Sequence, residues 1–151
     1  MPLTALVRQL QQVPLTGEVL DRSRRPDRLR LQGASRGARA LLASAMARCE
    51  GAPLLVVVPT LEEAGRWAAL LELMGWPTTQ LYPTSEGSPY EAFDPTSEIT
   101  WGQLQVLSEL VDEQGEGWQG VIVATERALQ PHLPPPAVLA DQCLTLRKGA
   151  S

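Results

Sequence analysis

Apolar residues recur along the chain with two different periods. Over residues 3–11 they follow helical spacing, which predicts a short amphipathic helix. Two stretches, LLVVV at 54–58 and VIVAT at 121–125, are instead continuously apolar and rich in β-branched residues. Such runs are typical of strands that are buried on both faces of a parallel sheet. The pattern therefore predicts a buried sheet flanked by helices.

The helices expected beside these strands differ in character. Residues 37–48 are rich in Ala and Leu on nearly all sides, which suits a helix packed closely against a sheet. Thr60 followed by Glu63 forms a capping box that starts a helix reaching about residue 74. Another helix is expected to begin at Pro95. Its buried stripe is expected at Leu104, Leu107 and Val111.

Shorter segments are expected to complete the sheet. Leu29 and Leu31 alternate with arginines, as in a strand with one buried face, and residues 79–81 and 143–146 are short apolar runs. Strands that alternate with helices predict an α/β fold, in which a parallel sheet carries helices on both faces. We divide the chain into an amino-terminal helix and linker over residues 1–27 and an α/β domain over residues 28–151.

Composition narrows the possible functions. The net charge of -4 and the pI near 5.0 argue against the chain as a whole being an electrostatic nucleic-acid binder, although seven arginines gather between Arg22 and Arg39. The longest apolar run is far shorter than the roughly 20 residues of a membrane span, so the cytosol is the expected compartment. Cys49, Cys143 and His132 lack the spacing of a metal site. We therefore expect no metal and two free thiols.

The turn LQGASRGARA at 31–40 stands where a phosphate-binding loop would lie, between a predicted strand and a predicted helix. That loop has the pattern glycine, four residues, glycine, lysine and then serine or threonine. Counted from Gly33, the second glycine is replaced by Ala38, the lysine by Arg39 and the hydroxyl residue by Ala40. The room for the phosphate, the compact ammonium and the hydroxyl that would bind magnesium are all lost. We interpret this turn as a degenerate phosphate loop.

The remaining groups of the turn leave two interpretations open. They form a vestigial nucleotide-binding set that is not expected to function. The set consists of Gly33, Ser35, Arg36, Gly37 and Arg39. A purely structural strand-to-helix turn is favoured, and the alternative is weak binding of a phosphate or carboxylate by backbone N–H groups together with the two arginines.

Two threonines end the long apolar strands. Ligands of parallel sheets meet the carboxyl ends of the strands, and Thr60 and Thr125 follow or end the two buried runs there. Each threonine taken alone is best explained as a helix cap. No catalytic arrangement is expected, because His132 is the one histidine of the chain and no Ser/His/Asp or Cys/His set can be built.

The order of these elements resembles the first half of a superfamily-two helicase domain of the RecA type. A phosphate loop, a strand ending PT (58–60 reads VPT) and a strand ending VAT follow one another. Adding LYPTSEGSPYEAFDPTSEITWGQLQVLSEL at 81–110, the chain is similar to the amino-terminal, UvrB-like module of the bacterial transcription-repair coupling factors. In this superfamily the two threonine-bearing strand ends touch the nucleic acid. The acidic Walker B pair is missing here.

The resemblance implies a parent protein of known character. Such a protein is an ATP-dependent translocase on double-stranded DNA that releases stalled RNA polymerase and recruits UvrA in nucleotide excision repair. Its ATP and magnesium sites lie in a carboxyl-terminal motor, so this segment is expected to be a non-catalytic scaffold without a cofactor. The alternatives are a helicase-related ATPase and a nucleic-acid-binding α/β module that uses Arg36, Arg39, Thr60 and Thr125.

Overall fold

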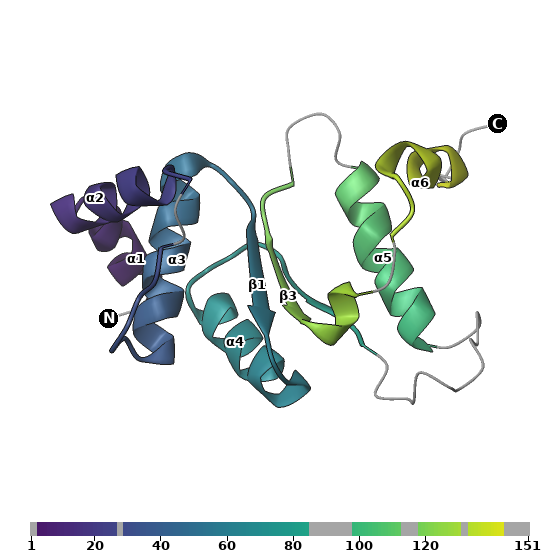
Figure 1. The fold of residues 1–151 in the computed structure, drawn as a ribbon, viewed down its shortest axis with the longest axis horizontal. Coiled ribbons are helices and arrows are strands. Elements are labelled where there is room, and N and C mark those ends of the chain that lie inside the picture. Colours follow the sequence, from purple (N-terminus) through teal and green to yellow (C-terminus); the bar gives the residue numbers. More distant parts are fainter. Residues whose placement is uncertain (1–2, 27–28, 85–97, 113–117, 131–132, 144–151) are drawn as a thin grey trace.

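A three-stranded parallel sheet is the centre of the fold (Figure 1). The computed structural model describes residues 3–26, 29–84, 98–112, 118–130 and 133–143. Strand β3 (Val121–Thr125) lies between β1 (Leu54–Val58) and β2 (Thr79–Tyr82). In the register of the sheet, Val121 lies opposite both Leu54 and Thr79. The two long apolar runs of the sequence are therefore neighbouring strands.

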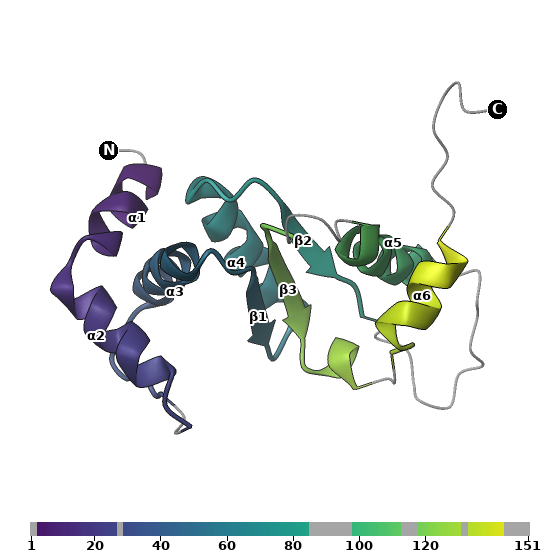
Figure 2. The same cartoon turned by 90° about the horizontal axis from the view of Figure 1, so that it is seen from above.

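Helices precede, connect and follow the strands. The first two helices of the chain pack on the third (Figure 2). The helices are α1 (Leu3–Gln11), α2 (Pro14–Ser23), α3 (Arg36–Glu50), α4 (Leu61–Leu73), α5 (Glu98–Asp112), the 3-10 turn η1 (Arg127–Leu129) and α6 (Pro136–Gln142). None of the helices in the described ranges is long and apolar enough to cross a membrane.

The larger hydrophobic core lies on the face of the sheet covered by α3 and α4. Val56 and Val58 of β1 and Val121 and Val123 of β3 point into it. The helices meet them with small side chains, which let helix and sheet backbones approach closely. These are Ala40, Ala45 and Ala47 on α3 and Ala64 and Ala68 on α4. Val7 of α1 is fully buried in the same cluster, so the amino-terminal helix shares this core.

A smaller core lies on the opposite face, under α5. Tyr82 and Ala124 from the sheet pack with Val106 of α5 and Ala128 of η1. Burial raises the pKa of the Tyr82 phenol, because the charged phenolate is poorly solvated there. Helices thus cover both faces of a parallel sheet, which confirms the predicted α/β class.

A buried polar cluster joins α3 to the end of α4. The indole N–H of Trp76 donates to the hydroxyl of Ser44 at 2.9 Å, and both residues are buried. The guanidinium of Arg48 lies over the Trp76 ring, 5.0 Å from its centre. It also donates to the carbonyls of Met74 at 3.1 Å and Gly75 at 2.7 Å. Arg48 therefore satisfies the carbonyl end of α4, where a cation is favourable.

Two sequence predictions about the amino-terminal half were wrong. Leu29 and Leu31 are exposed and belong to no strand, so the turn that follows them is not the end of a sheet strand. The alternation of leucine and arginine was not enough to predict a strand, because a strand also needs a neighbouring strand to pair with. Residues 14–23, interpreted as part of a linker, form α2. Its start at Pro14 is explained by the proline at the first helical position, which needs no backbone N–H.

The carboxyl-terminal half departs from the prediction in two more places. Leu104 of α5 is exposed, and the residue that α5 buries most fully against the sheet is Val106. Leu107 of the predicted stripe does pack against the smaller core, so the prediction was wrong for Leu104 and missed Val106. Residues 136–142 form α6, which the run of prolines concealed. The predicted strand over 143–146 lies outside the described residues except for Cys143, which follows α6.

Removing the Ser44 hydroxyl should destabilise the fold. Ser44→Ala leaves the buried indole N–H of Trp76 without an acceptor, which costs about 1–3 kcal/mol of the free energy of unfolding. Trp76→Phe removes the donor, and the double variant should lose less than the sum of the two single variants. Urea unfolding of the four proteins measures this coupling. Strictly additive losses would show that the hydrogen bond contributes nothing.

The Arg36–Glu63 pair at the carboxyl edge of the sheet

Helix α3 begins with a serine cap after a glycine turn. Gly33 has φ +75°, in the left-handed region that favours glycine. Ser35 follows as the N-cap, and its Oγ accepts from the N–H of Ala38 at 3.3 Å. The N–H of Arg39 bonds the Ser35 carbonyl at 3.0 Å. The loop thus uses its own side chain to satisfy backbone donors at the start of the helix.

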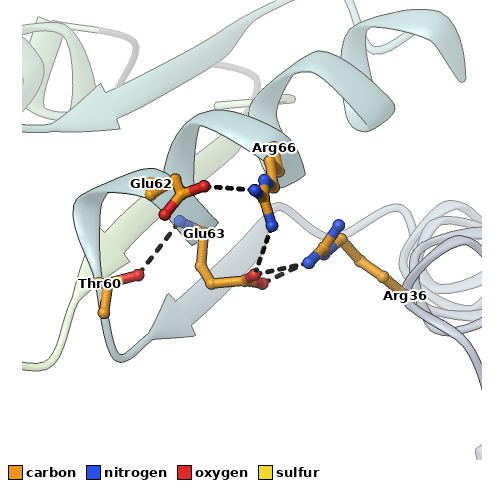
Figure 3. A network of polar contacts seen from close by, with 5 residues as sticks. All are labelled: Arg36, Thr60, Glu62, Glu63 and Arg66. Carbon is orange, nitrogen blue, oxygen red and sulfur yellow. Dashed lines mark hydrogen bonds and ion pairs between the residues drawn. The ribbon is translucent and has the colours of Figure 1, made fainter.

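Arg36, the first residue of α3, binds a carboxylate of α4 with both arms of its guanidinium. Its Nε donates to Glu63 Oε2 at 3.1 Å and its Nη2 to Oε1 at 2.5 Å. Arg66 approaches Glu63 at 3.5 Å and also pairs with Glu62 (Figure 3). Both side chains of the Arg36–Glu63 pair are about one-third exposed. The fork-to-fork geometry is the strongest arrangement available to an arginine and a carboxylate.

Thr60 is placed beside this pair by the start of α4. It follows β1 as the N-cap of the helix, and its Oγ1 accepts from the backbone N–H of Glu63 at 3.2 Å. The predicted cap is therefore confirmed. Glu63 connects Thr60, through its backbone, with Arg36, through its side chain. Thr60 and Arg36, both predicted as site residues, are thus linked by Glu63.

Thr125 lies at the same edge but is buried. It pairs in register with Val58, and the N–H of the following Glu126 donates to the Val58 carbonyl at 3.1 Å. Its Oγ1 accepts from the N–H of Ala128 at 3.2 Å, capping the turn of η1. The strand ends that carry the two threonines are therefore adjacent. The Thr125 hydroxyl is turned into the fold, where it serves as a local cap.

The side chains at the loop positions expected to bind phosphate and magnesium do not face a common site. Arg39 is exposed, and its Nε donates to the carbonyl of Ala34 at 2.9 Å. Ala40 is fully buried and belongs to the larger core. Gly37 has open space where a side chain would lie. A hydroxyl at position 40 would therefore meet apolar side chains of the core.

The pairing of Arg36 with Glu63 has no signal in the sequence. The two residues are 27 positions apart, and the capping box had already explained Glu63. The spacing of Glu62 and Arg66 at four residues on one helix was a visible signal for their ion pair. Among the described residues, no three His, Cys, Asp or Glu side chains are grouped as metal ligands would be. Cys49 and Cys143 are free thiols, as expected.

Arg36→Ala should destabilise the protein more than Arg39→Ala. Loss of the two-armed contact leaves Glu63 beside Glu62 with a weaker counter-charge, and a partly exposed pair is worth about 1 kcal/mol or less. Arg39 provides the matched control, because its one bond is to a backbone carbonyl of its own loop. Urea unfolding at low and high salt measures both. Equal effects of the two substitutions would contradict a structural role for the pair.

Comparison with known proteins identifies relatives of the whole stretch. The chain is 35% identical over 150 residues to the transcription-repair-coupling factors of Mycobacterium bovis and Mycobacterium tuberculosis. These alignments take in 96% of the chain and 12% of each relative, so the chain spans about one-eighth of their length. No protein-family model and no solved structure matches it. Over its matched length, the chain belongs to the transcription-repair coupling factor family.

Proposed function

We propose that this segment is a non-catalytic scaffold of a transcription-repair coupling factor. The observation that carries the proposal is the Arg36–Glu63 contact. If this loop bound a nucleotide, its arginines would have to face the phosphates, whereas here both arms of Arg36 hold a carboxylate of α4. The same contact fixes the start of α3 against the start of α4. The loop thus serves the packing of the domain.

Other features of the loop support the absence of a bound nucleotide. Ala40 faces the core and offers no magnesium ligand, and Arg39 is anchored to its own loop. Glu63 occupies both arms of Arg36 and Glu62 pairs with Arg66, so neither arginine is free to meet a polyphosphate. On this proposal, neither ATP nor magnesium is a cofactor of the segment. ATP hydrolysis, and contacts with RNA polymerase, UvrA and double-stranded DNA, belong to the longer protein.

Isothermal titration with ATP and magnesium tests this proposal directly. The 151-residue chain should give no binding heat at micromolar ATP. Glu63→Gln is an informative second protein, because it weakens the hold on Arg36 without removing the Thr60 cap on the backbone. We expect weak binding of pyrophosphate at most in this variant, since Ala38 and Ala40 are unchanged. Micromolar ATP binding by the original chain, abolished in Arg36→Ala, would refute the scaffold proposal.

A second candidate function is contact with a nucleic-acid backbone. Exposed arginines in the amino-terminal third favour such a contact. The burial of Thr125 and the pairing of Arg36 with Glu63 argue against it. The exposed arginines include Arg22, Arg24, Arg25, Arg30 and Arg39. If they bind phosphate, affinity for a DNA duplex should fall steeply as salt rises. Fluorescence anisotropy at two salt concentrations measures the slope. A signal that is absent at low salt would remove this candidate.

A further inference from the structure

Helices α5 and α6 pack together and leave an open groove between them. The groove has a volume of about 770 Å³ and shares no residue with the carboxyl edge of the sheet. In Figures 1 and 2, α6 lies beside α5, on the side of the molecule away from α1–α3. Its lining includes Trp101, Leu104, Gln105 and Ser108 from α5, and Leu139 and Cys143 from α6 and its end. Two helical surfaces thus form its walls.

The wall contributed by α5 carries exposed apolar side chains at helical spacing. Trp101 is 64% exposed and Leu104, three residues later on the same face, is 41% exposed. A tryptophan of this exposure is unusual, because its large apolar surface is normally buried, and such residues are enriched among the anchors of protein interfaces. The groove therefore offers an apolar surface without a partner among the described residues.

Trp101 is held in place by contacts that α5 makes with the rest of the fold. Val106 packs in the smaller core under α5, and the side-chain amide of Gln103 donates to the Pro83 carbonyl at 2.9 Å. Gly102 allows the close approach to Pro83, because a Cβ there would lie 2.9 Å from the proline ring. The position of Trp101 is thus fixed before any partner arrives. Such preorganisation lowers the entropy lost on binding.

The two helices that form the groove carry acidic residues and no basic ones. Helix α5 contains Glu98, Glu109 and Asp112 and no Lys or Arg. Helix α6 adds Asp141 and no basic residue. Glu98, the first residue of α5, itself lines the groove. This distribution attracts a basic partner and repels nucleic acid and anionic lipid.

We propose that the α5–α6 groove binds an amphipathic helix of a partner protein that carries basic residues beside its apolar stripe. Apolar anchors at helical spacing would cover Trp101 and Leu104, and flanking lysines or arginines would meet Glu98 and Asp141. A second copy of the chain fits less well, because two such grooves would bring acidic residues together. The interaction is independent of the loop at Arg36.

Titration with a synthetic peptide probes the groove in the 151-residue chain. The probe is a helical peptide with leucines at positions i, i+3 or i+4, and i+7, flanked by lysines. A second peptide keeps the leucines and replaces the lysines with glutamates. We expect the lysine peptide to bind and to shift Trp101 emission to the blue as the indole is covered. The glutamate peptide should bind at least about tenfold more weakly, and added salt should reduce the difference.

Substitutions distinguish specific binding at Trp101 from nonspecific binding to exposed apolar residues. Trp101→Ala should weaken the lysine peptide by about tenfold or more and abolish the emission shift. Leu73→Ala is the matched control, because Leu73 is 63% exposed but lies on α4 and not in the groove. Glu98→Gln with Asp141→Asn should weaken binding about two- to fivefold, and Glu72→Gln on α4 should have no effect. Circular dichroism confirms that each variant is folded.

Four results would overturn the proposal. One is equal binding of the lysine and glutamate peptides, which would show an apolar surface without charge selection. Another is unchanged affinity in Trp101→Ala, which would place the peptide elsewhere. A third is a dimer in sedimentation that Trp101→Ala dissociates, which would make a second copy the occupant. The fourth is the absence of any binding by the lysine peptide.

Discussion

The position of β3 between β1 and β2 determines which face of the sheet each connecting helix covers. Along the chain, the path moves from β1 to β2 and then returns to β3 in the middle. Because crossovers between parallel strands are right-handed, movement in opposite directions puts the connecting helices on opposite faces. Helix α4 therefore covers one face and α5 the other. The fully buried valines of β3 hold the sheet together from the larger core.

The two faces receive unequal cover. On the α4 face, α1 and α3 add further layers, and the alanines of α3 and α4 let these helices lie close. On the α5 face, a small cluster around Tyr82 and Val106 holds a single helix. One consequence is the exposure of Leu55 and Val57, whose side chains alternate with Val56 and Val58 along β1 and point to the thinly covered face. The same imbalance leaves the outer side of α5 open.

The parts of the structure that could be predicted are those determined by neighbours in sequence. The strands at 54–58 and 121–125 were evident from continuous apolar runs, and the Thr60 cap from its spacing to Glu63. Leu29 and Leu31 had the pattern of a strand, but pairing depends on a partner that local sequence does not reveal. Helices α2 and α6 begin at prolines, which a reader of sequence treats as interruptions. The contact between Arg36 and Glu63 joins separate helices, so no local sequence pattern predicts it.

The burial of Ala40 also limits how this loop can change over evolutionary time. A hydroxyl at position 40, introduced alone, would enter the apolar core and lose its hydrogen bonds to water. A lysine at position 39, introduced alone, would supply the ammonium but neither the glycine at position 38 nor the hydroxyl at position 40. Each single step toward a nucleotide-binding loop therefore lowers stability or gains no affinity. Nucleotide binding at this loop would therefore require several substitutions at once, none of which is favoured when it occurs alone.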